Sequence, residues 1–95
     1  MQITGILWLE EIVEKLAWKH RVLRHEVRAV FQNRPHVCFI EKGHRVDENV
    51  YSAFGRTAEG RYLIVFYVLK LDHQALILSA RDMTSKERKY YEKTL

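Results

Sequence analysis

Apolar residues recur at two different spacings along this chain, and the spacing changes at Pro35. Before the proline they fall three or four positions apart, in two stripes: Leu9, Ile12, Val13, Leu16 and Ala17, then Leu23, Val27, Val30 and Phe31. This spacing is typical of amphipathic helices. We therefore predict one helix from Leu9 to about His20. A second should end before Pro35, because a proline ring disfavours helical geometry at the preceding residue.

After Pro35 the pattern changes to that of β-strands. Four stretches show alternation or continuous apolar character: 37–40, 50–56, 62–69 and 75–80. The third is apolar throughout, so we expect a central strand covered on both faces. The connections are too short for anything but hairpins, which predicts an antiparallel sheet. Residues 3–8 fit either an edge strand or a lead-in segment.

A start signal marks a helix at the end of the chain. Thr84 precedes Glu87 by three residues, and this is the spacing of a capping box, in which each side chain bonds the other residue's backbone N–H. We predict a helix from Ser85 to about Lys93. Arg81 then stands at the carboxyl end of a buried strand, where a rigid frame can hold a cation that meets an anion.

Length and composition restrict the class of protein. Ninety-five residues, 47% of them apolar and 29% charged, suit a single domain over 1–95 of an ordinary soluble globular type. One cysteine, Cys38, allows no internal disulfide and favours a reducing cytoplasm. Three glutamates interrupt the first apolar stretch, so we expect no signal peptide and no membrane segment. The net charge of +4 favours a polyanionic partner.

The elements together predict an α+β domain. It should have two N-terminal helices, an antiparallel sheet of about four strands and a C-terminal helix.

Several short motifs occur in an order that is similar to a known family. They are Trp8, Lys19–His20, Glu26–Val27, Val30–Phe31, Gly55–Arg56–Thr57, Gly60–Arg61, Leu63–Phe66, Ser79–Ala80–Arg81, and Glu87–Arg88 ahead of Tyr90. Together they resemble the BrnT family, which are small ribonuclease toxins of type II toxin-antitoxin systems with a fold similar to RelE. The likeness spans nearly the whole chain. It departs at Arg21, where the family commonly has glycine, and at Leu16, where an asparagine is usual.

The resemblance implies an endoribonuclease that cleaves mRNA and a cognate antitoxin that holds it inactive by covering a basic groove. We expect RNA and the antitoxin as partners, no cofactor and no membrane. A homodimer and a toxin-antitoxin hetero-oligomer both stay open. Two other hypotheses also stay open. One is a catalytically degenerate module that binds an antitoxin or nucleic acid without cleavage. The other is a protein that inhibits another macromolecule by binding it, as relatives of this fold do with DNA gyrase.

Metal-independent RNA cleavage by transesterification needs a base, cations and an acid. Arg56 and Arg81 are the candidate cations, because the planar guanidinium holds phosphate with two bonds. His20 is the candidate base or acid, since imidazole exchanges protons near neutral pH. Lys19 beside it suits phosphate, although both cations would also complement the dipole at a helix end.

Five residues are predicted to bind the substrate: Lys19, Tyr51, Lys86, Arg88 and Tyr90. Tyr90 or Tyr91 on the last helix could stack on a base or donate a proton. A core or surface role is the alternative for each of them. We expect no metal site, because His36 and His44 are eight residues apart and no further ligand accompanies them.

Overall fold

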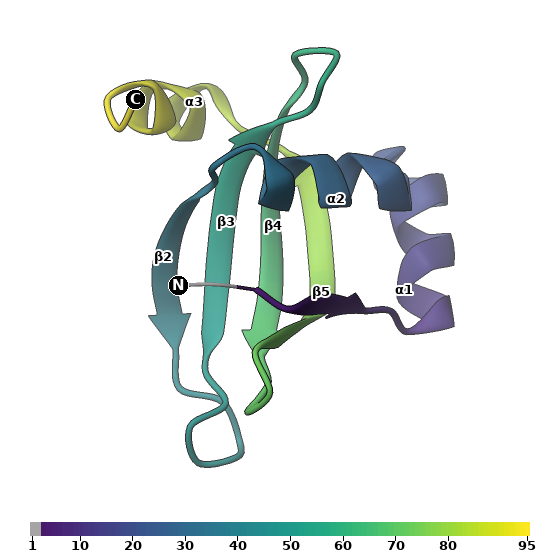
Figure 1. Ribbon diagram of the computed structural model, residues 1–95. Coiled ribbons are helices and arrows are strands. Elements are labelled where there is room, and N and C mark those ends of the chain that lie inside the picture. Colours follow the sequence, from purple (N-terminus) through teal and green to yellow (C-terminus); the bar gives the residue numbers. More distant parts are fainter. Residues whose placement is uncertain (1–2) are drawn as a thin grey trace.

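The computed structural model describes residues 3–95 and shows a five-stranded sheet with helices on both sides (Figure 1). The strand order is β1-β5-β4-β3-β2. In chain order the elements are β1 (Gly5–Leu7), α1 (Glu10–Lys15), η1 (Leu16–His20), α2 (Arg24–Gln32), β2 (His36–Glu41), β3 (Val50–Arg56), β4 (Tyr62–Leu69), β5 (Gln74–Asp82) and α3 (Ser85–Glu92).

The predicted sheet of about four antiparallel strands is corrected to a mixed sheet of five. β2 to β5 are antiparallel neighbours, as expected, but β1 joins the outer edge of β5 as a parallel strand. β1 has only three residues and begins with Gly5, so its sequence is too short to show alternation. The prediction of an α+β fold with two N-terminal helices and one C-terminal helix is confirmed.

The first helix ends in a wider turn than its sequence indicates. Its last five residues form a π-helix, η1, which closes at Arg21 with φ 54° and ψ 40°. These angles lie in the left-handed region that glycine adopts without strain. The family that the sequence resembles commonly has glycine at this position. In this chain an arginine adopts the backbone conformation that is typical of glycine.

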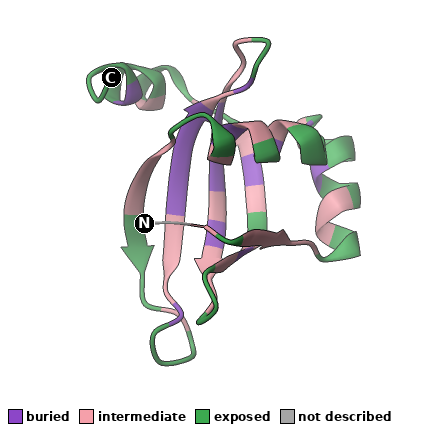
Figure 2. Cartoon of the chain, in the orientation of Figure 1, coloured by how far each residue is buried: buried purple, intermediate pink, exposed green. Residues whose placement is uncertain are grey.

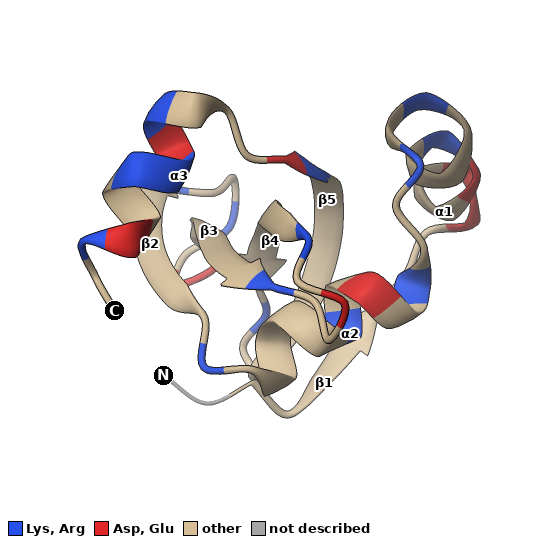
Figure 3. Ribbon diagram, turned by 90° about the horizontal axis from the view of Figure 1, so that it is seen from above, with Lys and Arg blue, Asp and Glu red and all other residues tan. Residues whose placement is uncertain are grey.

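Alternation along the strands divides the sheet into two faces. Seen from above, α2 lies on one side of the sheet and α3 on the other (Figure 3). We call these the helix face, which also packs against η1, and the α3 face. The main core fills the helix face, and its buried members include Val27, Val30, Ala53, Leu63, Val65, Tyr67 and Ile77. Burial is concentrated in the middle strands (Figure 2).

Gly55 lets α2 approach the sheet closely. A Cβ atom at this position would lie 2.9 Å from Cγ1 of Val30, which is closer than such atoms approach in proteins. α2 can therefore rest directly on β3, and Val30 is fully buried.

A smaller cluster holds α3 against the opposite face. Tyr91 is 3% exposed and packs with Phe54 and Ile64. The predicted capping box is confirmed at the start of the helix: the Glu87 amide donates to Oγ1 of Thr84 at 3.1 Å, and the Thr84 amide donates to Oε1 of Glu87 at 2.8 Å. Within residues 3–95, no helix is long and apolar enough to cross a membrane.

Replacing Thr84 by alanine should lower the free energy of unfolding by about 1 kcal/mol, because the amide of Glu87 loses its acceptor. Chemical denaturation followed by circular dichroism measures the change. Ser85→Ala is the matched control, since it removes a hydroxyl from the next residue and leaves the cap intact. Equal midpoints for the Thr84 variant and the wild type would show that the cap does not stabilise α3.

Candidate active site

Arg56 and Arg81 lie at the same end of the sheet and on the same face. β3 and β5 run parallel to each other on either side of β4, so their carboxyl ends lie at the same end of the sheet. Arg56 is opposite Tyr62, and Arg81 is opposite Ile64. Two strand spacings across the sheet and an offset of two residues along it separate their backbones, which is about 12 Å. The strands therefore bring the two predicted catalytic arginines together on the α3 face.

The ring of Tyr62 contacts two arginines, Arg56 and Arg88. The guanidinium carbon of Arg56 lies 4.5 Å from the centre of the Tyr62 ring, and that of Arg88 lies 3.9 Å from the same centre. Arg56 also donates to the carbonyl oxygen of Gly60 from Nη2 at 3.2 Å. Cation-π contact favours this arrangement. It holds two positive charges side by side at the end of the sheet.

Arg81 is held by a carboxylate from α3. Its two terminal nitrogens donate to Oε1 and Oε2 of Glu87 at 2.7 and 2.9 Å, and its guanidinium lies 5.6 Å from the centre of the Phe66 ring. The hydrogen bond from Arg81 lowers the pKa of Glu87. Arg81 is thus oriented by the residue that caps α3, and about a third of its side chain stays exposed.

Tyr90 contacts a histidine that the sequence did not connect with it. Its hydroxyl oxygen lies 2.9 Å from Nε2 of His36 and 3.4 Å from Sγ of Cys38. Fifty-four positions separate Tyr90 from His36. The only sequence signal was that His36 and Cys38 share one face of an alternating strand, and nothing indicated that α3 would cover that face.

Two sets of α3 residues point to different sides of the helix. Lys86 and Tyr90 are four positions apart and share one flank, and Arg88 and Glu92 share another. Arg88 reaches Tyr62 at the end of the sheet. All three α3 residues that were predicted to bind substrate, Lys86, Arg88 and Tyr90, are exposed.

His20 and Lys19 are not brought to these arginines. They end η1, which packs on the helix face through Leu16, and the carbonyl oxygen of His20 accepts from Nη2 of Arg61 at 3.0 Å. Tyr51 also belongs to the helix face, where its ring stacks on Tyr67 with centres 5.9 Å apart. Tyr51 therefore lies on the opposite face from the predicted cations, whereas His20 is close enough to Asp82, the residue after Arg81, for its charge to lower the pKa of that carboxylate.

Arg61 ties the helices to the sheet. It donates to carboxylates of Glu26 at 3.1 Å and Asp82 at 2.7 Å, and to the carbonyl oxygens of His20 and Arg21. The sequence analysis quoted Arg61 only within a family motif. Its contacts fix where η1 ends and where α2 begins, since Glu26 also accepts from the backbone amide of Leu23.

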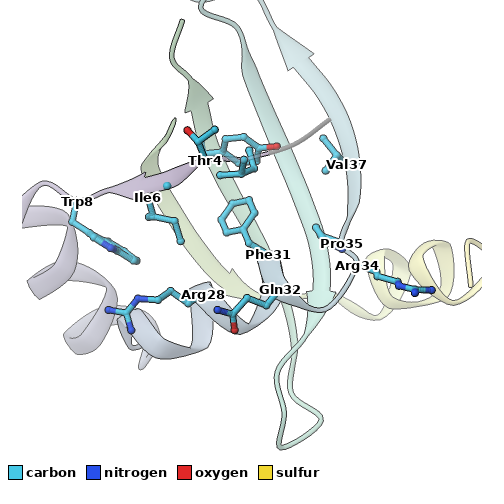
Figure 4. Close-up of a pocket in the computed structure, with 12 residues that line it drawn as sticks. Thr4, Ile6, Trp8, Arg28, Phe31, Gln32, Arg34, Pro35 and Val37 are labelled. Atoms are coloured by element: carbon cyan, nitrogen blue, oxygen red, sulfur yellow. The ribbon is translucent and has the colours of Figure 1, made fainter. Parts of the chain in front are cut away.

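A cavity of about 830 Å³ lies on the helix face, between β1, α2 and β2 (Figure 4). Ile6, Trp8, Phe31 and Val37 give it apolar walls, and none of the predicted site residues lines it. Apart from its two arginines, its titratable group is Tyr67, and burial raises the pKa of this tyrosine to about 12. The cavity therefore lacks a side chain that exchanges protons near neutral pH.

Comparison with known proteins supplies the family. A model of the ribonuclease toxin BrnT of type II toxin-antitoxin systems matches residues 8–87. The chain belongs to the BrnT family. The match contains His36, Arg56 and Arg81 and ends at Glu87, inside α3. A search of curated proteins gives no match. At the level of the BrnT family, the substrate class is RNA and the partner is an antitoxin.

The ion pair between Arg61 and Asp82 predicts a pH dependence of stability. The hydrogen bond from Arg61 lowers the pKa of Asp82 in the folded protein. The stabilisation is complete above the unfolded value, about 3.9, and is lost as the pH falls through the lower folded value. Asp82→Asn should therefore lose less stability than the wild type between about pH 5 and pH 3, measured by urea unfolding. Equally steep losses in both proteins would show that this pair contributes nothing.

Proposed function

We propose that this BrnT protein cleaves mRNA on the α3 face by metal-independent transesterification, in which a ribose 2′-oxygen attacks the adjacent phosphorus. One observation supports this above the others: Arg56, Arg81 and Arg88 gather on one face at one end of the sheet. Negative charge grows on the phosphate oxygens during the attack, and preorganised cations stabilise it.

The three arginines have different tasks in this proposal. Arg81 stabilises the charge that develops on the attacked phosphate, because Glu87 fixes the plane of its guanidinium in advance. Arg56 and Arg88 bind phosphates of the flanking nucleotides from their positions on Tyr62. Lys86 adds an exposed charge on the flank of α3 that also carries Tyr90. Tyr51 takes no part, since it lies on the opposite face of the sheet, and in the described residues neither Lys19 nor His20 contacts Arg56 or Arg81.

A second candidate function is binding without cleavage. The observation in its favour is that Arg81 already has both of its terminal nitrogens on Glu87, which compensates its charge. A module of this type would keep the basic surface and the antitoxin partner but would not stabilise a transition state. The two functions differ in whether the loss of Arg81 affects cleavage more than binding.

Arg81→Ala should lower the single-turnover rate of RNA cleavage by about 10² to 10³, the scale seen when one preorganised charge stabiliser is lost. RNA affinity should fall far less, because the charge that Arg81 meets develops only in the transition state. Arg81→Lys should not restore the rate, since an ammonium cannot make the two-bond contact.

In cells, expression of the wild type without its antitoxin should arrest growth and fragment RNA.

Lys93→Ala is the control for a diffuse basic surface. It removes one exposed cation beyond the end of α3 and should reduce the salt dependence of RNA binding by at most about one unit of slope. Equal small losses for the Arg81 and Lys93 variants would refute the catalytic role of Arg81. Normal growth and intact RNA in cells that contain soluble wild-type protein would favour binding without cleavage.

A further inference from the structure

We propose that Tyr90 and His36 form the proton-accepting pair of this site and take the proton of the ribose 2′-hydroxyl that attacks the phosphate. This inference rests on the proposed ribonuclease function and names the base that the function needs. It takes the place of His20, which the sequence suggested and which contacts neither Arg56 nor Arg81 in the described residues.

Aromatic packing fixes the pair. The rings of His36 and Tyr90 meet edge to face with centres 5.5 Å apart, and both contact Phe54, at 6.2 and 5.3 Å. Phe54 is buried beneath α3. The 2.9 Å contact between Nε2 of His36 and the Tyr90 hydroxyl is therefore supported by a third ring and does not depend on the hydrogen bond alone. Such support preorganises a site before substrate arrives.

Tyr90 and His36 differ in solvent exposure, and this difference gives them different roles. Tyr90 is 45% exposed, so its hydroxyl is open to a substrate, while His36 is half-buried behind it. The ordinary pKa of tyrosine, about 10, keeps the Tyr90 hydroxyl protonated near neutral pH, and the hydrogen bond with Cys38 raises this pKa further. A protonated tyrosine cannot hold a second proton for long. It can pass one on to an imidazole nitrogen that accepts it.

The pair and Arg81 lie over the same row of the sheet. Cys38, which contacts Tyr90, is opposite Ser52, and Ser52 is opposite Phe66, over which the Arg81 guanidinium lies. Two strand spacings separate the backbones of Cys38 and Phe66, about 10 Å. A nucleotide between them would offer its 2′-hydroxyl to Tyr90 and its phosphate to Arg81.

Two protons move together when the 2′-oxygen attacks. The 2′-hydroxyl gives its proton to the oxygen of Tyr90 while Tyr90 gives its own to Nε2 of His36. The 2′-oxygen bonds to phosphorus, the bond from phosphorus to the 5′-oxygen breaks, and the 5′-oxygen takes a proton from water. The products are a 2′,3′-cyclic phosphate and a 5′-hydroxyl. His36 then releases its proton, which neutralises the hydroxide.

Single-turnover cleavage of a short RNA with a single cleavage site tests the pair. His36→Gln and Tyr90→Phe should each lower the rate by about 10² to 10⁴, the range for a positioned base. The double variant should be no slower than the slower single variant, because the two residues act in one relay. His25→Gln is the matched control, since His25 is an exposed histidine of α2 on the helix face, and its rate should stay within about twofold.

A second substrate shows whether the pair acts as a general base or as a general acid. Sulfur in place of the bridging 5′-oxygen gives a leaving group that needs no proton. The losses in the His36 and Tyr90 variants should persist with this substrate if the pair is the base. Restored rates would overturn the assignment, and so would variants that cleave the ordinary RNA as fast as the wild type.

Folding and function are checked separately. Thermal unfolding and RNA affinity of each variant should match the wild type, and Tyr90→Phe carries the test alone if His36→Gln does not fold, because it removes only one exposed oxygen. A wild-type protein that cleaves no RNA would overturn the proposed function itself. A wild type that cleaves, with variants that cleave equally well, would overturn only the pair.

Discussion

The alternation of side chains along β3, β4 and β5 is the constraint on which the site depends. Successive residues of a strand point to opposite faces, except where the register of β5 shifts between Ile77 and Ser79. A residue's position relative to that shift decides which groups it can meet. The helix face carries the main core beneath α2 and η1, and its cavity of about 830 Å³ is lined by none of the predicted site residues. Arg56 and Arg81 fall on the other face, which α3 covers only in part. Phosphate-binding groups can therefore be both rigidly held and open to solvent there.

Their carboxylate partners give Arg61 and Arg81 different tasks. Arg61 is taken up by Glu26 and Asp82 and by carbonyl oxygens at the end of η1, so its charge serves the fold. Arg81 has one carboxylate partner, Glu87, which also caps α3. The position of α3 and the orientation of Arg81 are coupled through that residue. A change that loosens the cap should therefore also affect the site.

Sequence patterns were sufficient for the elements and insufficient for their pairing across space. The apolar run 62–69 and the capping box at Thr84 identified the central strand and the last helix, because both signals are local. β1 was left undecided, since a three-residue parallel strand depends on a partner almost seventy positions away. The same limit explains the site. His20 was chosen for its motif, whereas the contact of His36 with Tyr90 exists only because α3 folds back over β2.

RNA should lie on the α3 face of the sheet. The most direct test is to follow the amide chemical shifts of the protein while a non-cleavable RNA is added. The probe is a short strand with hydrogen in place of the 2′-hydroxyl at the cleavage site, titrated into isotope-labelled protein. We predict shift changes at His36 to Cys38, at Arg81 and from Lys86 to Tyr90, with α2 and η1 unchanged. Changes centred on η1 and α2, with the α3 face unaffected, would contradict the account.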